Sequence, residues 1–126
     1  MPEFVNPKEI LSQLRLEEDM VAADFGCGSG SWVIPLAEML KKGKIFAVDV
    51  QKEPLSALEG KAKLARILNI EIIIADVEEK IPEIEDSSCN LVLLTNLLFQ
   101  IKNKEAVVLT AEEFIELVDK KGIKNV

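Results

Sequence analysis

A glycine-rich turn between an expected strand and an expected helix constrains the fold more than any other feature of the chain. The apolar segment Met20–Phe25 predicts a buried strand, the turn Gly26–Gly30 carries a glycine at every second position, and Ser31–Lys42 has apolar residues at helical spacing. Glycines at such a junction let the backbone approach a ligand, and the helix that follows offers free N–H groups. The junction predicts a cofactor cradle, although a tight connection selected only for its geometry would show the same pattern.

Three further apolar segments continue the alternation of strands and helices. Lys44–Val50, Ile70–Ala75 and Leu91–Thr95 predict strands, and Pro54 opens a helix between the first two of them. Their apolarity is nearly continuous, which is typical of strands covered by helices on both faces. The pattern predicts an α/β fold, a three-layer αβα sandwich with a mainly parallel sheet and right-handed crossovers.

Length and charge narrow the function classes. The chain has 126 residues, which suits a single domain spanning residues 1–126. Its 15 basic and 22 acidic residues give a net charge of −7, so we expect no nucleic-acid partner. The N-terminus has no basic segment followed by an apolar one, and no apolar run is long enough to span a membrane. We therefore expect a cytoplasmic protein with no membrane contact.

The cysteine and histidine counts limit the possible chemistry. The two cysteines, Cys27 and Cys89, are 62 positions apart and have no second metal-type ligand beside them, so we expect reduced thiols and no metal site. The sequence contains no histidine, which excludes Ser-His-Asp triads and Cys-His dyads. Carboxylates, lysines, backbone dipoles or a cofactor must carry any chemistry.

Acidic residues lie at the carboxyl ends of three of the expected strands. Asp24 lies near the end of the first strand, Asp49 near the end of the second and Asp76 directly after the third. The carboxyl ends of parallel strands form the crevice in which open α/β sheets bind ligands, and an acid at the position of Asp49 can accept hydrogen bonds from both ribose hydroxyls. Each acid taken alone could equally be a solvated loop residue or a helix cap.

The glycine spacing separates two classes of cofactor. Dinucleotide-binding proteins use G-x-G-x-x-G, whereas here the third glycine, Gly30, comes one residue early and Asp24 precedes the first glycine. A carboxylate beside the turn would repel a pyrophosphate and attract an ammonium or sulfonium group. The spacing therefore favours S-adenosylmethionine, and leaves an NAD-dependent oxidoreductase as a less favoured alternative.

Four segments in order resemble the motifs of the class I S-adenosylmethionine-dependent methyltransferases. These segments are Asp24–Gly30, Phe46–Asp49, Ala75–Val77 and Asn90–Asn96. The resemblance covers about residues 4–108 and implies a Rossmann-like sheet of order 3-2-1-4. It also implies a transferase that uses S-adenosylmethionine, releases S-adenosylhomocysteine and methylates an acceptor, which we expect to be a small molecule. A non-catalytic module that binds either compound, or that only scaffolds a partner, is the alternative.

The resemblance also assigns roles to the turn and to the second strand. The methionine moiety would be wrapped by four residues of the turn: Gly26, Cys27, Gly28 and Gly30. Asp24 would lie near the amino group of that moiety. Asp49 would hold the ribose hydroxyls, and Val50 would pack on the adenine ring.

The remaining implied site residues follow the third and fourth strands. Asp76 would accept a hydrogen bond from the adenine amino group, with the backbone of Val77 beside it. Asn96 would face the methyl-transfer site. Asn96 and Gln100 can orient an acceptor, but capping and turn hydrogen bonds explain them equally well, so no catalytic residue is assigned.

The resemblance ends after the fourth strand. Family members continue through a fifth, sixth and seventh strand, whereas this chain passes from an expected helix at Lys104–Leu109 to the pattern of a last helix at Thr110–Phe114. An uncovered edge at Leu91–Thr95 would be unfavourable. We therefore expect either that Ile123–Val126 pairs there as a short strand, or that two chains form a homodimer through this edge.

Overall fold

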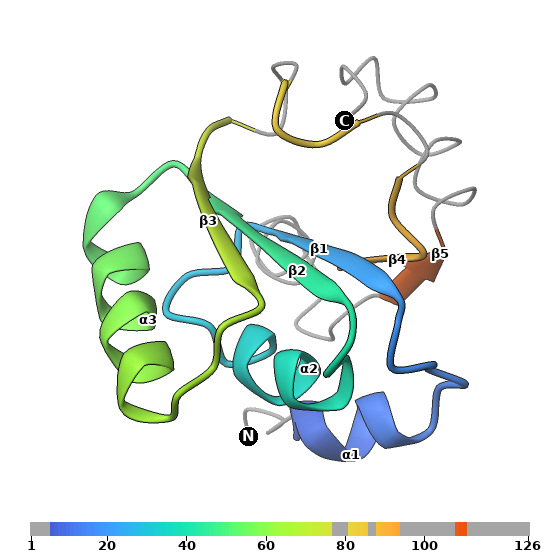
Figure 1. The fold of residues 1–126 in the computed structure, drawn as a ribbon. Coiled ribbons are helices and arrows are strands. Elements are labelled where there is room, and N and C mark those ends of the chain that lie inside the picture. Colours follow the sequence, from blue (N-terminus) through green and yellow to red (C-terminus); the bar gives the residue numbers. More distant parts are fainter. Residues whose placement is uncertain (1–5, 77–80, 86–87, 94–107, 111–126) are drawn as a thin grey trace, which may run out of the picture.

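The computed structural model describes residues 6–76, 81–85, 88–93 and 108–110 (Figure 1). Three helices and five strands are assigned in this part of the chain. In sequence order they are α1 (Pro7–Ser12), β1 (Val21–Phe25), α2 (Val33–Met39), β2 (Lys44–Asp49), α3 (Lys52–Leu64), β3 (Ile70–Ile74), β4 (Leu91–Leu93) and β5 (Val108–Thr110).

The strands form one sheet in the order β3-β2-β1-β4-β5. The pairs β2–β3, β1–β2 and β1–β4 are parallel, which confirms the predicted order 3-2-1-4 and the α/β fold. Asp24 pairs with Ala47 and Leu93, and Asp49 pairs with Ile74, so the carboxyl ends of neighbouring strands lie at one edge of the sheet.

The partner of β4 differs from the predicted one. Val108–Thr110 pairs antiparallel with Leu91–Leu93, so β4 has β1 on one side and β5 on the other. The expectation that Ile123–Val126 fills this edge is therefore wrong. The helix expected at Lys104–Leu109 is wrong at Val108 and Leu109, which belong to β5, and residues 104–107 lie outside the described residues. A homodimer through this edge stays a prediction and would have to pair through β5.

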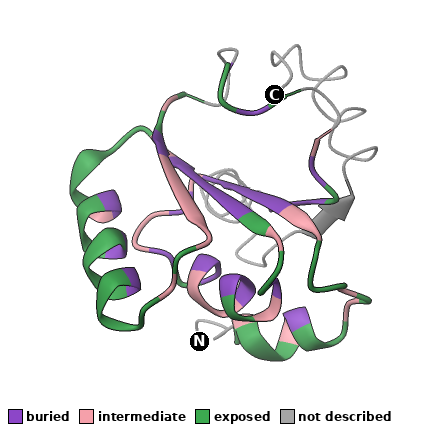
Figure 2. Ribbon diagram, in the orientation of Figure 1, coloured by how far each residue is buried: buried purple, intermediate pink, exposed green. Residues whose placement is uncertain are grey.

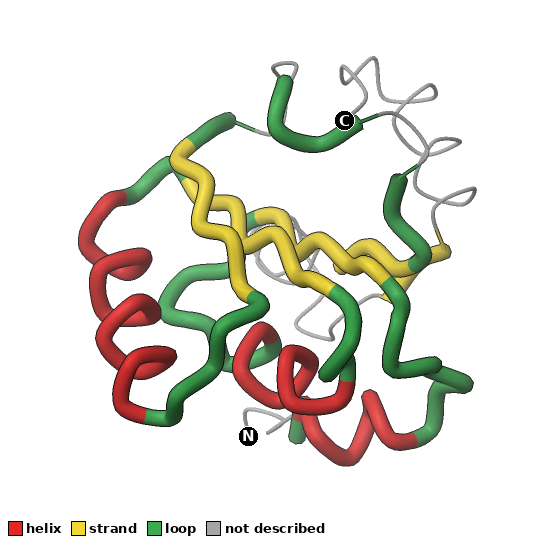
Figure 3. The backbone as a smooth tube through the Cα atoms, in the orientation of Figure 1, coloured by secondary structure: helices red, strands yellow, loops and turns green. Residues whose placement is uncertain are grey.

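All three described helices lie on one face of the sheet (Figure 3). The buried sides of α2 and α3 face the strands, and their exposed sides point outward (Figure 2). The core between the helices and the sheet includes Leu36 of α2, Leu58 of α3 and Ala47 of β2. A second cluster on the opposite face joins Phe25 of β1 to Ile81 and Ile84. The helical layer predicted for that face falls outside the described residues.

Local sequence signals explain where the helices begin and end. Asn6 caps α1, because its side-chain oxygen accepts a hydrogen bond from the Glu9 N–H at 3.3 Å. Gly60 lies inside α3 without ending it. The expected apolar stripe extends to Leu68, yet α3 ends at Leu64 because Arg66 adopts a left-handed conformation with φ of 57°. In the described part of the chain, no helix is long and apolar enough to cross a membrane.

Candidate functional site

The glycine turn connects β1 to α2 through three residues with positive φ. The φ angles are 76° at Gly26, 56° at Gly28 and 91° at Gly30, a region that glycine adopts without steric cost. The N–H groups of Gly26 and Cys27 both donate to the carbonyl oxygen of Val48, at 2.8 and 3.1 Å. The first half of the turn is therefore anchored to the end of β2.

Asp49 joins the turn to the loop that follows β2. Its Oδ2 accepts a hydrogen bond from the Gly28 N–H at 2.8 Å, and its Oδ1 accepts one from the Gln51 N–H at 3.0 Å. A carboxylate oxygen can accept more than one hydrogen bond, so both oxygens retain acceptor capacity for ligand hydroxyls. The structure thus brings together two predicted site residues, Gly28 and Asp49, that are 21 positions apart.

Asp24 is fully buried in β1. It shares its face of the strand with Ala22, which belongs to the helix-side core. Its charge acts on Cys27, whose thiol pKa is raised first by burial and then by the negative charges of Asp24 and Asp49. Both carboxylates therefore oppose ionisation of the thiol in the turn.

The expected adenine-side residues lie on the neighbouring strand ends. Val50 directly follows β2 and is 60% exposed, which is unusual for an apolar side chain beside a buried strand. Asp76 lies two residues after β3 and is exposed. Val77 and Asn96 lie outside the described residues. Contact between the predicted residues and a ligand stays a prediction.

Packing behind the turn was not predicted from sequence. A Cβ atom on Gly30 would lie 2.4 Å from Cδ1 of Leu58 in α3, so the backbone of the turn and this helix are in close contact. The sequence signal was weak, because Leu58 looks like any other residue of the apolar stripe of α3. The third glycine is thus required by helix packing as well as by its backbone conformation.

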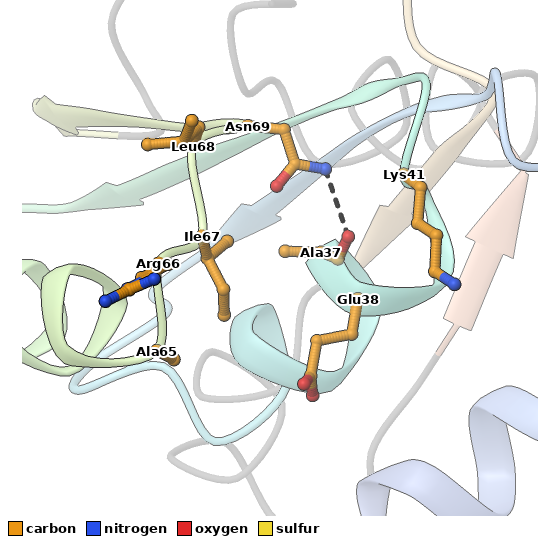
Figure 4. A pocket seen from close by; sticks show the side chains of 8 residues that line it. All are labelled: Ala37, Glu38, Lys41, Ala65, Arg66, Ile67, Leu68 and Asn69. Carbon is orange, nitrogen blue, oxygen red and sulfur yellow. Dashed lines mark hydrogen bonds between the residues drawn. The ribbon is translucent and has the colours of Figure 1, made fainter.

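The pocket found in the structure lies away from the glycine turn. A pocket of about 370 Å³ lies between the end of α2 and the loop before β3, at the amino ends of the strands, and contains no predicted site residue (Figure 4). Asn69 lies at this pocket and donates hydrogen bonds to the carbonyl oxygens of Ala37 and Leu40, at 3.0 and 2.7 Å. No cluster of three or more potential metal-binding side chains occurs among the residues that the structure describes.

Comparison with known proteins identifies the family. Residues 22–122 match the family model described as a methyltransferase domain, and the chain belongs to this family. It is 36% identical over 69 residues to a probable cobalt-precorrin-6B C(15)-methyltransferase (decarboxylating) of Methanosarcina acetivorans, a match that covers 55% of this chain and 38% of that relative. The chain thus spans well under half the length of this relative.

Solved structures agree with the family assignment. A SAM-dependent methyltransferase from Aquifex aeolicus superimposes with a TM-score of 0.61 at 30% identity, covering 69% of this chain and 46% of the other. A putative methyltransferase from Streptococcus mutans in complex with SAH gives a TM-score of 0.50 at 28% identity, covering 56% and 39%. S-adenosylmethionine is therefore the cofactor of the class to which the chain belongs, and an NAD-dependent oxidoreductase is not favoured.

Proposed function

We propose that the protein is an S-adenosylmethionine-dependent methyltransferase acting on a small-molecule acceptor. The observation that carries the proposal is the glycine turn, held by the bond from the Gly28 N–H to Asp49 at the end of β2. This bond places an open backbone segment and a carboxylate side by side at the carboxyl ends of the strands, where the ligands of open α/β sheets bind.

The electrostatics of the turn suit a cationic ligand. Asp24 in β1 and Asp49 at the end of β2 both raise the thiol pKa of Cys27, which lies in the turn, after the larger effect of burial. S-adenosylmethionine carries an ammonium and a sulfonium group, which a negative potential attracts, whereas a pyrophosphate would be repelled. The two carboxylates therefore support S-adenosylmethionine over a dinucleotide in the proposal.

The chain's own residues bind and orient the reactants. In the proposed arrangement the turn wraps the methionine moiety, Asp49 accepts hydrogen bonds from the ribose hydroxyls, and Val50 and Asp76 contact the adenine. S-adenosylmethionine supplies an activated methyl group, so the protein contributes mainly positioning and exclusion of water. Because the sequence has no histidine, any general base must come from another residue type.

Two observations support a small-molecule acceptor. The net charge of −7 disfavours a nucleic-acid substrate. The Methanosarcina acetivorans relative is named for methyl transfer to cobalt-precorrin-6B, which is a small molecule. In the proposal, Asn96, which lies outside the described residues, faces the methyl-transfer site.

Calorimetric titration of the 126-residue chain tests the proposal. We expect binding of S-adenosylmethionine and S-adenosylhomocysteine, and no binding of NAD. Light scattering on the same sample gives the mass and tests for a homodimer. Binding of NAD alone, or of none of the three compounds, would contradict the proposal. Binding without methyl transfer to any of a panel of small molecules would favour a non-catalytic module.

A further inference from the structure

The second half of the glycine turn lies against α3. Leu58 is fully buried and occupies the space where a Cβ atom of Gly30 would be. Three residues further along the same helix, the Nζ atom of Lys61 donates a hydrogen bond to the carbonyl oxygen of Ser29 at 3.3 Å. Figure 1 shows the loop after β1 passing beside α3.

Lys61 differs in its contacts from the neighbouring lysine of α3. Lys63 makes an exposed ion pair with Glu59 on its own helix, at 3.7 Å. Lys61 instead reaches the backbone of a residue 32 positions earlier in the sequence. The sequence pattern places both lysines on a solvated helix face, but only the bond of Lys61 links two parts of the fold.

The bond of Lys61 complements the anchors that β2 provides. Gly26, Cys27 and Gly28 donate their N–H groups to Val48 and Asp49, which fixes the first half of the turn. Ser29 belongs to the second half, where the contact comes from α3. The turn is therefore held between the end of β2 and one face of α3.

We propose that Lys61 is a positioning residue that holds the glycine turn in the conformation that binds the cofactor. Lys61 does so through its hydrogen bond to the Ser29 carbonyl. This inference rests on the proposed function for its consequence in binding, but its structural part, the restraint of the turn, can be measured without any ligand.

Cys27 provides a reporter inside the turn. Its thiol is buried, so reaction with a maleimide requires local opening of the turn. Cys89 is also buried but lies in the cluster on the opposite face of the sheet. Peptide mass spectrometry after labelling measures both thiols in one sample, and the ratio of their rates separates opening of the turn from general destabilisation.

Three variants test the proposal. Lys61→Met keeps the aliphatic part of the side chain and removes the donor, Lys61→Arg keeps a donor, and Lys63→Met is the matched control on the same helix. We expect Lys61→Met to raise the Cys27 labelling rate, relative to Cys89, by about two- to fivefold, the range of an exposed charged contact. The Kd for S-adenosylmethionine should rise by a similar factor. Lys61→Arg and Lys63→Met should leave both quantities near those of the unaltered protein.

The outcomes distinguish this inference from the proposed function. Equal Cys27 labelling in Lys61→Met and Lys63→Met would overturn the inference, as would faster labelling with an unchanged Kd. If the unaltered protein binds no S-adenosylmethionine, the proposed function fails and with it the consequence for binding. The labelling ratio would then still decide whether Lys61 restrains the turn.

Discussion

Replacing Gly30 by alanine should strongly destabilise the protein, for two separable reasons. The φ angle of 91° is one that an alanine adopts only with strain, at a cost of about 1 to 3 kcal/mol. The added Cβ would also lie 2.4 Å from Cδ1 of Leu58, and overpacking of this kind costs about 1 to 3 kcal/mol. Alanine also lowers the conformational entropy of the unfolded chain, which offsets about 0.4 to 1 kcal/mol of this loss of stability. We therefore expect a net loss of about 1 to 6 kcal/mol.

Gly60 provides the matched control for this substitution. It lies within α3, and no atom lies within 4 Å of a Cβ built there. The same change to alanine should therefore stabilise the protein by about 0.5 to 1 kcal/mol, through the higher helix propensity of alanine. The two glycine-to-alanine changes should have opposite signs.

Urea unfolding of the variants separates the two costs at Gly30. Leu58→Val removes the Cδ1 atom that the new Cβ would meet while keeping most of the buried volume. In that background Gly30→Ala should lose the overpacking cost and keep the backbone strain, which gives a coupling of about 1 to 3 kcal/mol. A Gly30→Ala variant within about 0.5 kcal/mol of the unaltered protein, the limit for most surface substitutions, would refute the reasoning. An equal cost in both backgrounds would refute the role of Leu58.

Three further predictions concern binding, helix capping and pH. Asp49→Ala should weaken S-adenosylmethionine binding by about 1 to 3 kcal/mol in calorimetric titration, because the ribose hydroxyls lose their acceptor; an unchanged affinity would refute the placement. Asn69→Ala should lower the free energy of unfolding by about 1 to 2 kcal/mol, because the Ala37 carbonyl loses the Asn69 donor and the Leu40 carbonyl keeps only the Gly43 N–H; urea unfolding measures this. Burial raises the thiol pKa of both cysteines above the ordinary value of 9.0. The unfolded state therefore releases these protons first, and unfolding curves between pH 8 and 10 should show stability falling above about pH 9, at up to about 1.4 kcal/mol per pH unit for each thiol.

Much of the sheet could be predicted because buried parallel strands are apolar runs. The expected strand Lys44–Val50 exceeds β2 by one residue, and Ile70–Ala75 exceeds β3 by one residue. The edge strand β5 could not be found in this way. Three residues of strand are too few to show a period, and their conformation depends on pairing with β4, which sequence spacing does not encode.

In the candidate site, as in the sheet, features that are local in sequence could be predicted and contacts between distant residues could not. The residue types of the turn and the position of Asp49 were visible in the sequence, since the turn follows one strand and Asp49 lies at the end of the next. The bond between Asp49 and Gly28 was not visible, nor were the contacts of α3 with the turn. These depend on how α3 crosses the sheet, so they required the structure.

Asp49 has two roles that its substitution would remove together. Its carboxylate already accepts the Gly28 N–H, so Asp49→Ala removes an anchor of the turn as well as the proposed ribose acceptor. A loss of affinity for S-adenosylmethionine therefore contains a direct and an indirect part. Adenosine separates them, because it has the ribose but lacks the methionine moiety that the turn would wrap. If the direct part dominates, Asp49→Ala should weaken adenosine and S-adenosylmethionine by the same factor. A clearly smaller loss for adenosine would mean that Asp49 acts mainly by holding the turn, which is the role inferred for Lys61 from the opposite side.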